Sequence, residues 1–137
     1  MTGIGATSGN LDRGATRYTD ALVALGAFGV ALLIRALTWP SVLTAEGVRL
    51  VGPDAHYHLR RIVWTVENFP KVLTRDFYVG FPNGGEPIWT PFFEQAIAWL
   101  AWLSVGPGNV DAVERLAVWA PPLLGSATVA ATYLVGR

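Results

Sequence analysis

An apolar stretch near the amino terminus, ALVALGAFGVALLIRALTW (Ala21–Trp39), decides the fold class of this chain. Its residues include one charge, Arg35, and as a helix rising 1.5 Å per residue they would span about 28 Å, close to the roughly 30 Å hydrocarbon core of a bilayer. Tyr18 and Trp39 flank the stretch, as aromatic residues do at membrane interfaces. A cleaved signal peptide is the alternative, but its apolar region would be about 7–15 residues long. We therefore expect an uncleaved transmembrane anchor.

The composition also indicates a membrane protein. The 137 residues are 52% hydrophobic and 15% charged, whereas about a quarter of the residues of a soluble domain are charged. The formal net charge is zero and no basic run alternates with aromatic residues, so we expect a lipid bilayer rather than a nucleic acid as partner. The absence of cysteine excludes disulfides and thiolate metal sites.

The rest of the chain divides into a tail, a loop and further apolar segments. Residues 1–20, rich in Gly, Ser and Thr, predict a disordered polar tail. Residues 40–89 carry most of the charge and predict a folded extramembrane loop. Residues 90–105 are apolar but short for a membrane span, so a buried or re-entrant helix is the alternative there to a second transmembrane helix.

A third transmembrane helix is predicted over residues 112–136. Asp111 and Glu114 have the spacing of a capping box, which would begin this helix. Pro121 and Pro122 are expected to kink it, which membrane helices tolerate when neighbours satisfy the freed carbonyl groups. The fold predicted from these segments is an all-α polytopic membrane protein with three spans and one large loop.

The loop contains the sequence GPDAHYHLRRIVWTVENFPK, which predicts an amphipathic helix over about residues 54–68. Asp54 is a good N-cap residue, and Pro70 would end the helix. The apolar residues expected on the packed face recur at helical spacing: Leu59, Ile62, Val63, Val66 and Phe69. A charged helix of this kind at a membrane surface is a candidate site.

Each ionisable residue of this helix has a functional and a structural interpretation. The Asp54 carboxylate would suit Mg²⁺ or Mn²⁺, but N-capping alone also explains it. Asp54 and His58 are four residues apart and meet at the helix start, whereas His56 and His58, two apart, make a poor metal pair and are better explained as solvated or satisfied histidines. Arg60 and Arg61 would hold a phosphate, or lie at lipid headgroups.

Three sequence blocks resemble a known protein family. Composition, periodicity and residue spacing alone do not identify this family. GPDAHYHLRRI, then NFPKVLTRDFYVGFPNGGEPIWTPFFEQAIA, then VERLAVWAPPLLGSATVAATYLVGR, in this order, resemble the N-terminal part of prokaryotic oligosaccharyltransferase catalytic subunits, membrane glycosyltransferases of the GT-C class. The similarity covers about residues 21–137. It implies a cytoplasmic tail and a first loop outside the cytoplasm, an orientation that the distribution of basic residues leaves open. It also implies that residues 90–105 are a true span.

The resemblance implies transfer of a glycan from a lipid-linked phosphate or diphosphate carrier to the Asn of an Asn-x-Ser/Thr acceptor polypeptide. Asp54 matches the family aspartate that helps to bind a divalent metal, Mn or Mg, and contacts the acceptor asparagine. Tyr57, His58 and Arg60 match the motif around it and are expected to support substrate binding. The metal is the implied cofactor, and the lipid-linked oligosaccharide and the acceptor polypeptide are the implied partners.

The remaining family motifs, a second acidic metal motif, a later acidic loop residue and a Trp-Trp-Asp signature, lie beyond the third span. Asp76 and Glu86 lie in turn-like segments and Glu94 opens a helix, so none is expected to replace them. The expectation is a fragment that is inactive alone. Two alternatives stay open: another GT-C enzyme that uses a polyprenyl-phosphate sugar, and a non-catalytic membrane scaffold or remnant.

Overall fold

The computed structural model describes residues 8–137, with side chains described from residue 16 onward. The chain forms two compact units. The first combines the chain up to Thr38 with Pro121–Arg137, and the second is Trp39–Ala120. The helices and strands, in order, are α1 (Ser8–Ala36), α2 (Trp39–Val42), β1 (Leu43–Thr44), β2 (Gly47–Val48), α3 (Pro53–Glu67), α4 (Phe92–Ser104), α5 (Val110–Ala117) and α6 (Ala120–Gly136).

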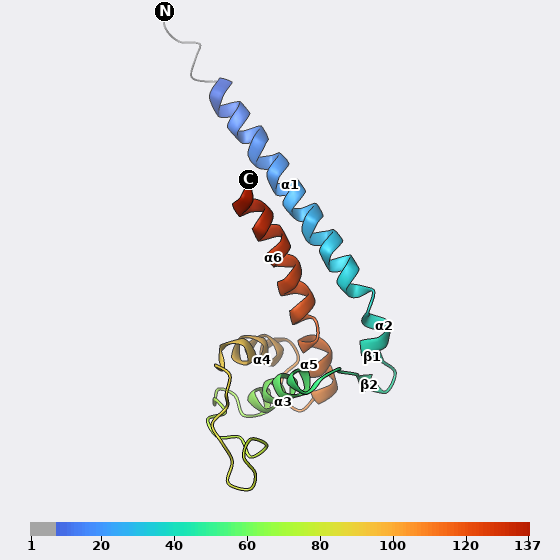
Figure 1. The fold of residues 1–137 in the computed structure, drawn as a ribbon, viewed down its shortest axis with the longest axis vertical. Coiled ribbons are helices and arrows are strands. Elements are labelled where there is room, and N and C mark those ends of the chain that lie inside the picture. The colour runs from blue at the N-terminus through green and yellow to red at the C-terminus, as the bar shows by residue number, and fades with distance from the viewer. Residues whose placement is uncertain (1–7) are drawn as a thin grey trace, which may run out of the picture. The chain divides into compact units, whose positions relative to one another are not determined.

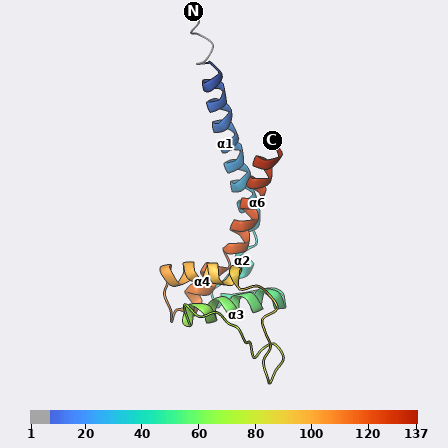
Figure 2. The same ribbon diagram turned by 90° about the vertical axis from the view of Figure 1, so that its left-hand side faces the viewer.

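In the first unit, α1 and α6 lie side by side and run in opposite directions (Figures 1 and 2). Asp20 of α1 forms an ion pair with Arg137 and accepts a hydrogen bond from the Tyr133 hydroxyl at 3.4 Å. Towards the other end, a Cβ built on Gly125 would lie 2.9 Å from the Arg35 Nε. The absence of a side chain at Gly125 therefore leaves room for the Arg35 guanidinium against α6.

Two stretches of the described residues are long and apolar enough to cross a membrane, Thr16–Ala36 and Val110–Gly136. Only 11% and 6% of their apolar windows are buried, whereas the core helix of a soluble protein would be mostly buried. These stretches correspond to the first and third predicted spans. The second, at residues 90–105, corresponds to the 13-residue helix α4, which at 1.5 Å per residue is about 20 Å long. A membrane crossing there stays a prediction.

Helix α1 begins earlier than the sequence predicted. A disordered tail was expected through residue 20, but the helix starts at Ser8, so that prediction is wrong for residues 8–20, while residues 1–7 lie outside the described part. Extending an existing helix adds one hydrogen bond for each residue that is fixed, so it is far easier than nucleating one. The contacts of Asp20 with Arg137 and Tyr133 also hold this end of the helix.

The predicted capping box before the third span is also wrong. The N-cap of α5 is Asn109, whose side chain accepts a hydrogen bond from the Ala112 N–H at 3.2 Å. Asp111 instead lies in the first turn and pairs with Arg115 at 2.8 Å. An Asx cap two residues earlier satisfies the helix start, so Asp111 is free to make the i, i+4 pair on the helix surface.

The predicted continuous helix over residues 112–136 is interrupted between α5 and α6. The backbone leaves the helical pattern at Val118 and Trp119, directly before Ala120, Pro121 and Pro122. Proline has no N–H to give to the preceding turn and its ring crowds that turn, so a break at this place is the expected effect of the pair. The predicted kink is thus present as a short break, and the two prolines lie in the first turn of α6.

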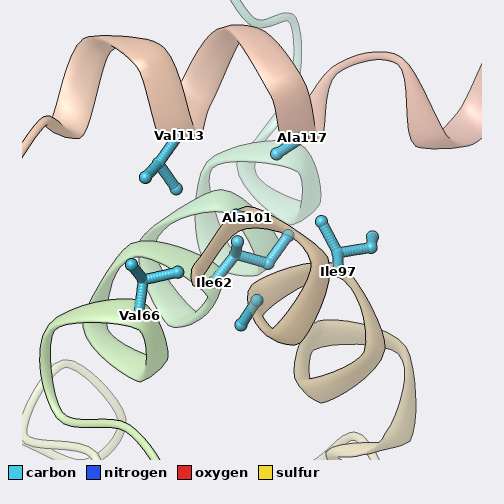
Figure 3. Close-up of a cluster of buried hydrophobic side chains, with 7 residues drawn as sticks. Ile62, Val66, Ile97, Ala101, Val113 and Ala117 are labelled. Carbon is cyan, nitrogen blue, oxygen red and sulfur yellow. The ribbon is translucent and has the colours of Figure 1, made fainter. Parts of the chain in front are cut away.

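The second unit has its hydrophobic core between α3, α4 and α5. Figure 3 shows side chains from the three helices pointing toward one another. The core residues are Ile62, Val66, Ile97, Ala98, Ala101, Val113 and Ala117. The predicted apolar face of α3 is confirmed: Ile62 and Val66 are buried, Leu59 and Val63 pack against the core, and Phe69 stacks on Trp102 at 4.8 Å.

The segment between α3 and α4 is held by a tight bridge at its middle. Asp76 N donates to the Gly85 carbonyl at 2.8 Å, and Gly85 N donates to the Asp76 carbonyl at 3.0 Å. The Asp76 carboxylate is buried, pairs with Arg60 and accepts from the Tyr78 N–H at 2.9 Å. Asp76 thus ties the loop both to itself and to α3.

Substituting Gly85 tests this bridge. A Cβ at Gly85 would lie 3.0 Å from the Val79 carbonyl oxygen, a backbone atom that cannot easily move. We expect Gly85→Ala to lower the free energy of local opening of this loop by about 1–3 kcal/mol. Tryptic cleavage after Arg75 should then be about tenfold faster. Gly29→Ala is the control, because Gly29 has no positive φ, a Cβ there meets nothing within 4 Å, and the residue lies in α1, outside the loop. Equal cleavage rates in wild type and Gly85→Ala would contradict the prediction.

Candidate functional site

Helix α3 begins in a way that places Asp54 inside its first turn. Gly52 is the N-cap, with φ 94° and ψ 151°, and no side chain caps the helix. Pro53 follows as the first helical residue, a position that suits proline because its missing N–H would be unbonded there anyway. The positive φ at Gly52 explains why the cap is a glycine. The predicted N-cap role of Asp54 is therefore wrong.

The Asp54 carboxylate is available to a ligand. Asp54 is exposed, and among residues 16–137, whose side chains the structure describes, none forms a hydrogen bond or ion pair with it. A carboxylate in the first helical turn is favoured by the partial positive charge at the helix N-terminus. With capping excluded, this interaction with the helix N-terminus is the structural role that remains for the carboxylate, and both of its oxygens stay free to bind a ligand.

His58 lies one turn further along α3 and has a fixed orientation. Its Nδ1 lies 2.7 Å from Oε1 of Glu94, which comes from the first turn of α4. Its ring also packs against Phe93 and Trp89, with centroid distances of 5.8 and 6.0 Å. Asp54 and His58 lie one helical turn apart, as predicted, and Nδ1 of His58 is directed to Glu94 rather than to Asp54.

Glu94 is the buried centre of this cluster. It is 1% exposed, and its Oε1 also lies 2.9 Å from Nη1 of Arg61, which is itself 2% exposed. Arg61 donates in addition to the Trp89 carbonyl at 3.3 Å. The other carboxylate oxygen, Oε2, and the hydroxyl of Tyr57 are buried with no hydrogen-bond partner. The prediction that Arg61 would face phosphate or lipid headgroups is wrong.

The remaining predicted residues lie on the same helix with partners of their own. Arg60 pairs with buried Asp76 and lies over the Tyr78 ring at 4.3 Å, so part of its binding capacity is already used. The Tyr57 ring lies under the Arg61 guanidinium at 5.3 Å. Substrate-binding roles for Tyr57, His58 and Arg60 stay predictions.

Sequence reasoning missed the importance of Asp76 and Glu94. Both were assigned to surface-like positions, a turn and a helix start, and both are buried. A usable signal was present for Glu94, since a carboxylate within the apolar segment PFFEQAIAWLAWLSV cannot be buried without a cation to pair with it. Asp76 offered no comparable pattern, because its partner Arg60 is joined to it by a loop of irregular backbone.

The donor atoms at the start of α3 suit part of a divalent metal site. No cluster of three or more His, Asp or Glu side chains that could hold a metal exists among the described residues. Asp54 nevertheless supplies one unpaired hard oxygen donor, and His58 has a ring nitrogen not bonded to Glu94. Carboxylate oxygen suits Mg²⁺ and Mn²⁺, and a mixed oxygen–nitrogen set suits Mn²⁺ better than Mg²⁺.

Comparison with known proteins finds a similar protein, and a membrane-associated class of glycotransferase is consistent with the two apolar stretches. The two apolar stretches indicate a membrane protein, and the similarity found among curated proteins agrees with this. The chain is 32% identical over 112 residues to the dolichyl-monophosphooligosaccharide–protein glycotransferase AglB of Haloferax volcanii. The match covers 79% of this chain and 10% of AglB, so the chain spans about a tenth of the length of this relative. No protein-family model and no solved structure matches the chain.

Proposed function

We propose that this chain is part of an oligosaccharyltransferase. The reaction proposed is transfer of a glycan from a dolichyl or polyprenyl phosphate or diphosphate to the asparagine of an Asn-x-Ser/Thr acceptor. The observation that carries the proposal is the 32% identity to AglB. Because 79% of the chain is matched, helix α3 with Asp54 lies inside the matched region wherever the match begins.

The exposed carboxylate of Asp54 supports this chemistry. An amide nitrogen is a poor nucleophile because its lone pair is delocalised into the carbonyl group. A carboxylate that accepts hydrogen bonds from the amide N–H groups makes that lone pair more available, and Asp54 has no described partner that competes for its oxygens. A bound Mn²⁺ or Mg²⁺ would stabilise the negative charge of the departing carrier phosphate.

The metal would need further ligands from outside this chain. Asp54 and His58 are two donors, whereas Mg²⁺ and Mn²⁺ prefer about six. The described residues contain no group of three or more His, Asp or Glu side chains that could hold a metal ion. We therefore assign the activity to the whole protein, of which this chain supplies the α3 side of the site.

The first unit supports a topology of two membrane crossings. Asp20 and Arg137 are ion-paired, so the beginning of the α1 span and the end of α6 lie at the same membrane face. With α4 as a further crossing, α6 would pass through the membrane in the same direction as α1. The antiparallel arrangement of α1 and α6 therefore favours two crossings over the three expected from the sequence. The family resemblance implies a cytoplasmic tail, so we place the amino-terminal end and Arg137 at the cytoplasmic face and residues 39–120 outside the cytoplasm.

The experiment is glycan transfer by the full-length protein, purified in detergent with lipid-linked oligosaccharide and Mn²⁺. A peptide with one Asn-x-Thr site should gain the mass of the glycan, while the same peptide with Gln-x-Thr should stay unmodified. Transfer of the sugar to water or to another lipid carrier, with the Asn-x-Thr peptide unmodified, would instead favour a different GT-C glycosyltransferase. An unmodified peptide and an unchanged donor would contradict catalysis.

A further inference from the structure

The contact between His58 and Glu94 determines which ring nitrogen carries the proton. Glu94 Oε1 can only accept, so Nδ1 of His58, at 2.7 Å, is the donor. Arg61 lies 2.9 Å from the same oxygen and supplies the positive charge that a buried carboxylate needs. A neutral imidazole is therefore sufficient for this hydrogen bond, and in the neutral ring Nε2 keeps a lone pair.

The packing of the ring leaves Nε2 as its free polar atom. Phe93 and Trp89 lie around the ring, and Tyr57 contacts it edge-on at 5.7 Å. The His58 side chain nevertheless stays 30% exposed, while Glu94 is 2% exposed. Metal-ligating histidines almost always donate their other ring N–H to a carboxylate, a backbone carbonyl or water, and the contact of His58 Nδ1 with Glu94 meets this condition.

The spacing along α3 brings this histidine to the exposed carboxylate. Asp54 and His58 are four residues apart in one helix, so their side chains lie on the same face about one turn apart. His56 is two residues from each of them and points elsewhere. This face of α3 therefore presents one oxygen donor, from Asp54, and one nitrogen donor, from His58. Of the two histidines, His58 is the one hydrogen-bonded to a buried carboxylate, that of Glu94.

We infer that His58 Nε2 is a ligand of the divalent cation together with Asp54, and that Glu94 is the residue that positions it. The inference rests on the proposed function, because it adds a second ligand to the metal site assigned to Asp54. It also predicts a metal preference. A nitrogen donor favours Mn²⁺ over Mg²⁺, so removing it should narrow the difference in affinity between the two ions.

The test measures Mn²⁺ binding to the full-length protein in detergent. Titration gives the dissociation constant, and pulsed EPR detects ¹⁴N nuclei coupled to the bound Mn²⁺. His58→Asn is the informative variant, because its amide N–H can replace Nδ1 as the donor to Glu94 but supplies nothing at Nε2. We expect it to remove one ¹⁴N coupling and raise the Mn²⁺ dissociation constant about 10–100-fold. The control is His56→Asn, which should keep both the coupling and the affinity.

The outcomes separate this inference from the proposed function. If Asp54→Asn weakens Mn²⁺ binding while His58→Asn leaves the ¹⁴N signal and the dissociation constant unchanged, His58 is not a ligand and the inference is overturned. If Asp54→Asn leaves Mn²⁺ binding unchanged, the metal role of Asp54 fails as well. Circular dichroism on each variant shows whether the helices are retained, and His58→Gln, which places an amide near the Nε2 position, should lose the ¹⁴N coupling with a smaller loss of affinity.

Discussion

Glu94→Gln is expected to lower the free energy of unfolding of the second unit by about 3–5 kcal/mol, because it leaves the Arg61 guanidinium buried without its counter-ion. The side chains of Arg61 and Glu94 are 3% and 2% exposed, so water cannot replace the lost charge. The substitution keeps the size and shape of the side chain, so the loss comes from charge rather than from packing. Chemical unfolding in detergent, followed by tryptophan fluorescence, measures the change.

Two further variants test whether the loss of stability comes from an unpaired buried charge. Replacing both partners, Glu94→Leu with Arg61→Met, should recover most of the lost stability, because apolar residues of similar volume often match a buried ion pair. Asp111→Asn removes one partner of the exposed Asp111–Arg115 pair and should leave unfolding unchanged. If Glu94→Gln unfolds like wild type, the buried ion pair does not stabilise the unit as the structure indicates.

The helical plan of the chain was predictable where hydrophobic periodicity is strong. Ile62 and Val66 recur at helical spacing and are buried as expected, and the apolar run before Trp39 belongs to a helix long enough to span a membrane. The helix starts were less predictable, because several residues compete for the cap. Gly52 caps α3 where Asp54 was expected, and Asn109 caps α5 where Asp111 was expected.

The candidate site was predictable only in part. Asp54 is exposed in the first turn of a helix, as expected, whereas the N-cap interpretation is wrong and its role in a site stays a prediction. The contacts of His58 and Arg61 with Glu94 join residues 36 and 33 positions apart in the sequence, which local periodicity cannot reveal. They follow from the packing of α4 on α3. The sequence left this tertiary arrangement open, because residues 90–105 were expected to form a membrane span with a buried or re-entrant helix as the alternative.

Asp54→Asn is expected to reduce glycopeptide formation by at least about 100-fold while leaving the fold intact. The amide removes the charge that would bind the cation and weakens the acceptor of hydrogen bonds from the substrate amide, each a contribution of several kcal/mol to the transition state. Stability should change little, because Asp54 makes no described contact and only its interaction with the helix dipole, about 0.3–1 kcal/mol, is lost. Initial rates with saturating peptide, and the unfolding curve of the same sample, measure both quantities.

A matched control is present in the same chain. Asp111 occupies the same position as Asp54, the second residue of a helix, is likewise exposed, and has its own partner in Arg115. Asp111→Asn therefore makes the same chemical change at the same helical position without removing an unpaired carboxylate, and we expect wild-type rates of transfer.

The most direct test of the account is the ratio of glycopeptide formation rates for Asp54→Asn and Asp111→Asn, measured side by side in the full-length protein with the same donor, peptide and Mn²⁺ concentration. The account predicts a ratio of about 0.01 or less, with both proteins folded. A ratio near one, with transfer intact in both variants, would contradict the assignment of Asp54 to the site.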